Sequence, residues 1–291
     1  MCGKGNLYRG PFPAIYGGSM KDDLMEQWLK AMGKYDPDKR RNFDDAIEYE
    51  FWKKTAPTFT EKNNLNDDTS LIADSILSFV DRGASVLEIG PGSGNFTVLL
   101  AQKAGRVFGI DFSEAMLREL RTRAENLHIG NIRSVCGKWE DYPLYERFDY
   151  IVSVNSLYRV QDIRGAIHKM NTYSSKGIII VRTIQRPFFY DLYKKAGAEA
   201  KERIDYQLLP QFFYEQGMHA DIKFLRYKKK CMFDSMESIM REMQKDLGKE
   251  FERVEGLLRQ KIASMALPCG EGILVFQPRE TVVISYKKEK D

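Results

Sequence analysis

The chain has 291 residues, enough for one elaborated domain or two small ones. Its formal net charge of +4 gives no basis for nucleic-acid binding by the chain as a whole. The four cysteines are widely spaced and form no Cys-x-x-Cys pair, which suits a reducing compartment and argues against a disulfide framework. No apolar run approaches the ~20 residues of a membrane span, and the N-terminus has no apolar signal core. We therefore expect a cytoplasmic protein without a membrane partner.

The N-terminal region is predicted to form an arm followed by helices. Residues 1–19 are rich in Gly and Pro and lack periodicity, which indicates an irregular arm. Apolar residues at helical spacing predict helices over 21–34 and 44–56. The second helix should end near Pro57, because a proline disfavours the helical conformation of the residue before it. We assign residues 1–66 to an N-terminal arm and helical cap.

Strands and helices alternate through the middle of the chain. Short apolar runs predict strands at 85–89, 106–111, 132–136, 148–154 and 177–184. Amphipathic segments between them predict helices at 67–80, 95–105, 113–125 and 162–173. Strands that alternate with helices of this length form a parallel sheet covered on both faces.

The pattern changes after Ile184. An aromatic-rich, mostly helical stretch runs to Gly217, and a strand follows at about 222–231. Two charged amphipathic segments precede a final strand, "TVVISYKK". The predicted fold is α/β: a Rossmann-like, seven-stranded, mostly parallel sheet with helices on both faces, the N-terminal helical cap, and helical insertions near the C-terminal strands. The core spans 67–291, with substrate or lid insertions at about 185–221 and 235–268.

The segment "VLEIGPGSGNFT" joins the first of these strands to a helix through glycines at 90, 92 and 94. Such a loop lets backbone approach a ligand beyond the carboxyl ends of the strands. A P-loop is excluded because no Gly-Lys-Ser/Thr follows. The NAD fingerprint is weakened because Asn95 stands where its third glycine belongs, but NAD stays open as an alternative. The third ligand of this type is S-adenosylmethionine.

"LEIGPGSG" resembles the Asp/Glu-x-Gly-x-Gly-x-Gly signature of class I S-adenosylmethionine-dependent methyltransferases. Asp111, which ends the second strand in "VFGIDFSEAM", and the stretch "VCGKWEDYPLYERFDYIVSV" match the family at the corresponding places. The chain departs from the pattern at Lys138, where the family commonly has an aspartate. The resemblance covers about 69–183 and is to the small-molecule type, the group that resembles ubiquinone and menaquinone methyltransferases.

The resemblance implies roles for the residues that bind the cofactor. Glu88 would lie near the ammonium of S-adenosylmethionine, and Asp111 would accept from the ribose hydroxyls. Gly90, Gly92 and Gly94 would let the chain pass under the ribose and methionine. Asp111 as a helix cap is the alternative, compatible with that role.

Further cofactor contacts are expected from the following segments. Because Lys138 replaces the usual aspartate, the Trp139 backbone and Glu140 become the candidates for the adenine. Asn155 corresponds to the position beside the methionine part, with an ordinary turn residue as the alternative. The remaining candidates are Phe112, next to the ribose acid, and Phe59, which with Trp52 resembles the paired aromatics that close over the cofactor.

Methyl transfer is a direct displacement at a sulfonium, so the protein mainly positions the nucleophile and excludes water. No catalytic residue is required by that chemistry. If a base takes part, the candidates are Tyr158 and Arg159, just past the fourth predicted strand, and His219. A packing role for Tyr158 remains an equal alternative. No cluster has metal-ligand spacing, so we expect no metal.

The sequence thus predicts a methyltransferase that uses S-adenosylmethionine, releases S-adenosylhomocysteine, and acts on a small-molecule acceptor held by the aromatic insertion. The alternatives are a protein or RNA methyltransferase and a non-catalytic S-adenosylmethionine-binding protein. The Asn/Asp-Pro-Pro-Tyr motif of amino-group methylation is absent, since the fourth strand ends "VNSLY".

Overall fold

The computed structural model describes residues 20–62, 67–184, 190–195, 197–198, 205–270 and 272–289. The predicted arm, residues 1–19, lies outside the described residues. The chain divides into two compact units. The first comprises Met1–Arg182, Asp205–Leu225 and Thr281–Asp291, and the second comprises Thr183–Ile204 and Arg226–Glu280.

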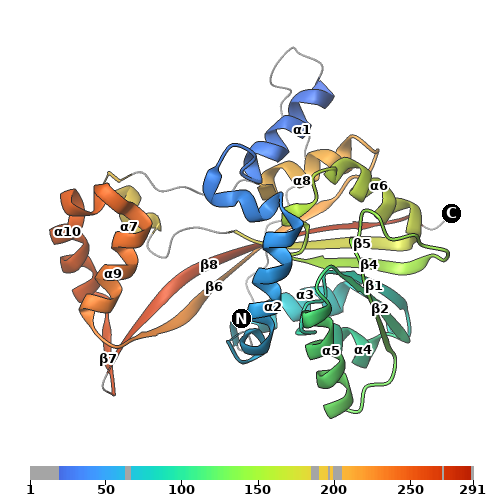
Figure 1. Cartoon of the computed structure of the whole chain (residues 1–291), viewed down its shortest axis with the longest axis horizontal. Helices are drawn as coiled ribbons and strands as arrows, with labels where there is room; N and C mark the ends of the chain where they lie inside the picture. Colours follow the sequence, from blue (N-terminus) through green and yellow to red (C-terminus); the bar gives the residue numbers. More distant parts are fainter. Residues whose placement is uncertain are drawn as a thin grey trace. The chain divides into compact units, whose positions relative to one another are not determined.

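The central sheet has the strand order β3-β2-β1-β4-β5-β8-β6 (Figure 1). Its strands are β1 (Ser85–Ile89), β2 (Arg106–Asp111), β3 (Ile132–Cys136), β4 (Phe148–Val154), β5 (Ser174–Thr183), β6 (Asp221–Phe233) and β8 (Gly272–Lys287). The strands β1 to β5 pair in parallel. The order reverses between β1 and β4, which is where open sheets of this kind bind ligands.

The last strand runs against its neighbour β5. Ile184 N–H donates to Glu280 O, whereas Lys288 N–H donates to Lys176 O, so the two strands pair in opposite directions. The predicted Rossmann-like, mostly parallel sheet is therefore confirmed, and the first four predicted strands coincide with β1 to β4.

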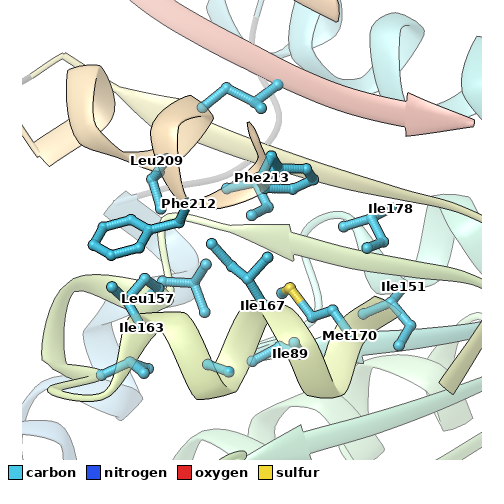
Figure 2. Packing of buried hydrophobic residues seen from close by; sticks show 14 of the residues in the cluster. Ile89, Ile151, Leu157, Ile163, Ile167, Met170, Ile178, Leu209, Phe212 and Phe213 are labelled. Atoms are coloured by element: carbon cyan, nitrogen blue, oxygen red, sulfur yellow. The ribbon is translucent and has the colours of Figure 1, made fainter. Parts of the chain in front are cut away.

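Helices cover both faces of the sheet and thereby bury its central strands on both sides. On one face, α3 (Asp67–Phe79) and α4 (Thr97–Lys103) pack through residues such as Ile76 and Leu100 against Val86 and Val152. On the other face lie α6 (Ile163–Tyr173) and α8 (Asp205–Tyr214). Figure 2 shows this second layer, in which the following side chains pack together: Ile89, Ile151, Leu157, Ile163, Ile167, Met170, Ile178, Leu209, Phe212 and Phe213.

The N-terminal segment forms α1 (Met20–Ala31), the short helix η1 (Pro37–Asn42) and α2 (Asp45–Lys62). Trp28 on α1 is fully buried, and its indole N–H donates to Val160 O at 2.7 Å. This hydrogen bond and the apolar contacts around it hold α1 to the rest of the first unit.

The expected end of the second helix near Pro57 is wrong, because α2 continues through Pro57 to Lys62. An internal proline costs a helix about 3 kcal/mol. Tertiary packing offsets this cost: Ala56 is buried against Ala115 and Met116 of α5 (Glu114–Asn126), with Phe59 packed beside them. The contact lies on both sides of Pro57 and keeps the helix continuous.

The second unit has its own apolar core. Its helices are α7 (Tyr190–Lys195), α9 (Met236–Leu247), η3 (Gly248–Glu250) and α10 (Phe251–Ala263). A short strand, β7 (Leu267–Cys269), pairs antiparallel with β8 and was not predicted. The buried residues that form this core include Ile239, Met243, Leu258, Ile262 and Val275.

Candidate active site

The loop after β1 has the backbone that its glycines permit. Gly90, Gly92 and Gly94 all have positive φ, at +66°, +57° and +87°. A Cβ at Gly90 would lie 2.3 Å from Ser156 Cβ, and one at Gly94 would lie 2.3 Å from Leu120 Cδ1. A Cβ at Gly92 would meet nothing within 4 Å. The outer glycines are thus required by packing, whereas the middle one borders open space.

This contrast predicts different results for two matched substitutions. Gly90→Ala should destabilise the fold by roughly 2–4 kcal/mol, because overpacking against the Cβ of Ser156 adds to the cost of positive φ. Gly92→Ala should cost only about 1 kcal/mol in stability but should weaken cofactor binding, because its methyl group enters the open space. Urea unfolding and calorimetric titration separate the two effects. Equal stability of the two variants would contradict this description of the loop.

Glu88 is a buried carboxylate with incomplete hydrogen bonding. Its side chain, near the end of β1, is 2% exposed, and its Oε2 has no hydrogen-bond partner among the described residues. Burial raises the pKa of Glu88 to about 7, the nearby Thr97 hydroxyl lowers it in part, and the charge of Asp111 raises it. A buried carboxylate oxygen without a partner is unfavourable by itself. An ammonium group placed there would satisfy it.

Asp111 ends β2 beside the glycine loop. Its Oδ2 accepts the Gly92 N–H at 2.9 Å, and its Oδ1 accepts the Ser113 N–H at 2.8 Å. Each oxygen retains a second lone pair, so the carboxylate can still accept from two hydroxyls. Burial raises the pKa of Asp111 to about 6, and the charge of Glu48 also raises it. The N-cap of α5 is Ser113, whose hydroxyl accepts from the Met116 N–H. The N-cap position proposed as the alternative role for Asp111 is therefore taken by Ser113.

Asn155 follows β4 with φ at +55°, and its side chain is exposed. The next residue, Ser156, donates from Oγ to Ile89 O at 2.6 Å and thereby fixes this loop to the end of β1. The loops after β1, β2 and β4 therefore meet at the carboxyl edge of the sheet. The predicted Glu88, glycine, Asp111 and Asn155 positions are brought together there.

The segment predicted to hold the adenine is anchored by a lysine. Lys169 Nζ donates to the carbonyl oxygens of Trp139 at 2.7 Å, Glu140 at 3.2 Å and Tyr142 at 2.6 Å. The Trp139 side chain is buried, whereas Glu140 is exposed. The Trp139 carbonyl oxygen is occupied by Lys169. Of the groups predicted to contact the adenine, the backbone N–H of Trp139 and the side chain of Glu140 therefore remain able to face a ligand.

Helix α2 contacts the segments that follow β2 and β4. Phe112 meets the ring of Tyr49 edge-on at 6.4 Å, and the Arg159 guanidinium lies 5.3 Å from the Phe112 ring. Phe59 packs edge-on against Trp52 at 5.4 Å between centroids. The two predicted aromatic cofactor residues, Phe112 and Phe59, thus lie at contacts of α2.

The two catalytic candidates after β4 are also engaged by the cap. Tyr158 hydrogen-bonds through its hydroxyl to Glu48, and burial and the charge of Glu48 raise its pKa above the ordinary phenol value. The phenol is therefore held protonated and is unsuited to act as a base. Arg159 donates to Asp45 Oδ1 at 2.8 Å and to Arg41 O at 3.1 Å. Its guanidinium fastens the cap.

His219 is not gathered with these residues. It is exposed after α8, and its ring meets Tyr214 edge-on at 5.8 Å. The predicted aromatic insertion at about 185–221 includes Phe188, Phe189, Phe212 and Phe213 as candidates for the acceptor site. Phe212 and Phe213 are fully buried in the core of the first unit. Phe188 and Phe189 lie outside the described residues.

The sequence interpretation missed the acids of α2. Asp45 forms ion pairs with Lys138 and Arg159, and Glu48 with Arg41 at 2.9 Å. One signal was available: in "DDAIEYEFW" these two acids are three residues apart and therefore lie on one face of a helix. The lysine in place of the family's aspartate thus has its own partner.

Two general features complete the site. Over the ranges that the structure describes, no three His, Cys, Asp or Glu side chains are grouped so that they could hold a metal ion. Within the same ranges, every helix is too short or too polar to span a bilayer.

Comparison with known proteins agrees with this geometry. Residues 86–177 match the family described as "Methyltransferase domain". An uncharacterised protein of Haemophilus influenzae is 26% identical over 210 residues, which cover 69% of this chain and 76% of that protein. A demethylmenaquinone methyltransferase of Geobacillus stearothermophilus is 31% identical over 108 residues, 35% of this chain and 45% of the relative. A ribosomal protein L11 methyltransferase of Aquifex aeolicus is 27% identical, over 45% of this chain and 53% of the relative. The chain thus spans only about half the length of these two named relatives.

Solved structures share the fold. The YcgJ protein of Bacillus subtilis matches with a TM-score of 0.50 at 13% identity, over 76% of this chain and all of that chain. The [4+2]-cyclase SpnF matches with a TM-score of 0.52 at 12% identity, over 85% of this chain and 97% of that chain. At these identities the likeness shows the fold alone.

The sheet order, the glycine loop and the family match over residues 86–177 support a class I S-adenosylmethionine-dependent methyltransferase. Its cofactor is S-adenosylmethionine. The residues present fit that molecule, because the buried carboxylate oxygen of Glu88 lacks a partner and the loop at Gly92 borders open space.

Proposed function

We propose that the protein transfers a methyl group from S-adenosylmethionine to a small-molecule acceptor by direct in-line displacement. The observation that carries the proposal is the buried Glu88 carboxylate, unpartnered at Oε2, beside the glycine loop and Asp111. When bound, S-adenosylmethionine supplies an electrophilic methyl group and its own leaving group. Glu88 binds the ammonium, Asp111 accepts from the ribose hydroxyls, and Gly92 leaves room for the chain to pass beneath. Phe112, Phe59, Asn155, Trp139 and Glu140 are the remaining proposed contacts.

The protein contributes mainly by holding the acceptor in line and excluding water, which is worth ~7–11 kcal/mol in favourable cases. A phenol held protonated at Tyr158 can orient an acceptor but does not remove its proton. We assign acceptor specificity to the insertions at about 185–221 and 235–268.

A small acceptor is favoured over a macromolecule by the low net charge and by the demethylmenaquinone relatives. Ribosomal RNA and ribosomal protein methyltransferases are also among the relatives, so a macromolecular acceptor is the second candidate. A third candidate is a reaction other than methyl transfer, since a [4+2]-cyclase, SpnF, shares this fold.

Labelled S-adenosylmethionine incubated with the protein and with size-fractionated bacterial extract tests the proposal. We expect labelled product in the low-mass fraction and S-adenosylhomocysteine in equal amount. Label confined to protein or RNA would assign the second candidate. Tight S-adenosylmethionine binding without methyl transfer to any fraction would indicate a non-catalytic binder or another reaction.

Asp111→Ala should weaken S-adenosylmethionine binding by about 10- to 150-fold, since hydrogen bonds to a charged group are worth ~1.5–3 kcal/mol. The variant should remain folded with a lower melting temperature, because the N–H groups of Gly92 and Ser113 lose their acceptors. Calorimetric titration with S-adenosylmethionine, and with NAD in parallel, measures the effect. Unchanged affinity in the variant, or NAD binding by the unaltered protein, would contradict the assignment.

A further inference from the structure

Glu48 is a buried carboxylate of helix α2 with a role that packing alone does not explain. Its side chain is 1% exposed. It receives the Trp52 indole N–H at 2.7 Å and the hydroxyl of Tyr158, and it is ion-paired with Arg41. A surface ion pair also fastens the same helix, since Asp45 is half exposed. Burying Glu48, the second acid that fastens this helix, has a desolvation cost. Fixed hydrogen-bond and ion-pair partners are needed to offset that cost.

The partners of Glu48 restrict what Tyr158 can do. The phenol gives its only proton to Glu48 and accepts the Trp52 indole N–H at 3.2 Å. One lone pair of the phenol oxygen remains. Tyr158 is therefore held in one orientation, as a hydrogen-bond acceptor toward any further group.

Glu48 also faces the cofactor loops. Tyr158 follows Asn155 by three residues, and the neighbour of Glu48 on α2, Tyr49, contacts Phe112 directly after Asp111. The charge of Glu48 raises the pKa of Asp111. The same helix therefore contacts the segments after β2 and β4 at once.

We propose that Glu48 is a positioning residue of the cofactor site: through Tyr158 and Trp52 it seats helix α2 on the loops after β2 and β4, so that binding of S-adenosylmethionine and seating of α2 are coupled. The inference rests on the proposed function, because it takes those loops as the place of the cofactor. It adds a third carboxylate, after Glu88 and Asp111, and assigns the cap a part in binding. Glu48 acts through its neighbours and is not a catalytic residue.

The test compares Glu48→Gln with Glu50→Gln. Glu50 lies on the same helix but is 67% exposed, in a surface pair with Lys53, so its substitution is the matched control. Two measurements are made: the affinity for S-adenosylmethionine from pH 5 to 8 by calorimetry, and acrylamide quenching of tryptophan fluorescence with and without S-adenosylhomocysteine. Trp28 and Trp139 are buried, so quenching reports mainly on Trp52.

For Glu48→Gln we expect S-adenosylmethionine to bind about ten-fold more weakly. We also expect that S-adenosylhomocysteine no longer protects the tryptophan fluorescence from acrylamide quenching. Below pH 7 the affinity should fall in both proteins as Glu88 is protonated, and the further fall caused by protonation of Asp111 should occur at a lower pH in Glu48→Gln, because Asp111 loses the negative charge that raises its pKa. The shift in the pH profile reports the charge of Glu48 near Asp111, whereas the lost protection from quenching reports the seating of α2. The other titratable groups that face Asp111, Glu88 on β1 and Cys136 on β3, are unchanged in the variant. Glu50→Gln should match the unaltered protein throughout.

Affinity, pH profile and quenching all unchanged in Glu48→Gln would overturn the proposal while leaving the proposed function intact. No binding of S-adenosylmethionine by the unaltered protein would overturn both. If Glu48→Gln does not fold, Tyr158→Phe replaces it: this variant keeps the charge and loses the phenol. It should weaken binding and increase quenching without moving the pH profile, and unchanged binding and quenching would overturn the proposal.

Discussion

Glu88→Gln is expected to stabilise the cofactor-free protein at pH 8 and to abolish measurable binding of S-adenosylmethionine. The pKa of Glu88 is raised from 4.5 to about 7 by burial. Between these two values the folded protein binds more protons than the unfolded chain, so stability falls as the pH rises from about 4.5 to 7. The full cost, above pH 7, is roughly 3 kcal/mol. Glutamine has the same shape and carries no charge, so it avoids this cost but offers an ammonium only one neutral amide oxygen.

Urea unfolding at pH 5 and pH 8 measures the first effect, and calorimetry the second. The stability gain of Glu88→Gln should be small at pH 5 and approach its full value at pH 8. Glu125→Gln, an exposed acid on α5, serves as the control and should show neither effect. A variant that is less stable than the unaltered protein at pH 8, or that binds S-adenosylmethionine normally, would show that Glu88 does not have this role.

Asp205→Ala is expected to destabilise the protein by about 3–5 kcal/mol, because it leaves a buried charge without its partner. Arg182, at the end of β5, is 2% exposed and donates to Asp205, which is 4% exposed at the start of α8. Asp205 also accepts the Tyr206 N–H at 3.0 Å. The Arg182 Nε already lacks a partner among the described residues, so the remaining guanidinium would be poorly satisfied.

Urea unfolding of Asp205→Ala and of the double variant Arg182→Met with Asp205→Leu checks this expectation. The double variant should recover most of the stability, since apolar replacement of a buried pair is often neutral. Glu280→Ala, which breaks the pair with the 78%-exposed Arg226, should cost less than about 1 kcal/mol. Equal losses in the single and double variants would mean that the residues contribute packing and not a compensated charge.

The sequence predicted the parts of the fold that depend on local pattern. The strands β1, β2 and β4 are short apolar runs, and they form as expected because a parallel sheet buries both of their faces. Strand β3 also forms as expected, although it lies at the edge of the sheet and is only partly buried. The continuation of α2 through Pro57 was missed because it depends on packing against Ala115 and Met116, which are distant in sequence. The 16-residue length of β8 was also missed, because Pro278 and the charged residues after it interrupt the apolar runs at 273–276 and 282–284.

The candidate site divides in the same way. Glu88, Gly92 and Asp111 were identified because a strand, a glycine loop and a following acid are adjacent in sequence or follow a fixed order. Glu48 was not identified, because its partner Tyr158 is 110 residues away and no local pattern joins them. Contacts of this kind are settled by how a cap folds back on the sheet.

Calorimetric titration of the unaltered protein with S-adenosylmethionine at pH 7, in two buffers of different ionisation enthalpy, tests whether the Glu88 carboxylate binds the ammonium of the cofactor. If the ammonium binds the Glu88 carboxylate, binding stabilises the ionised acid and releases up to about half a proton, since the pKa of Glu88 before binding is about 7. The observed enthalpy should therefore differ between the buffers, and a difference should persist in Asp111→Ala, which binds more weakly but keeps Glu88. An enthalpy independent of the buffer, or no binding at all, would contradict the account.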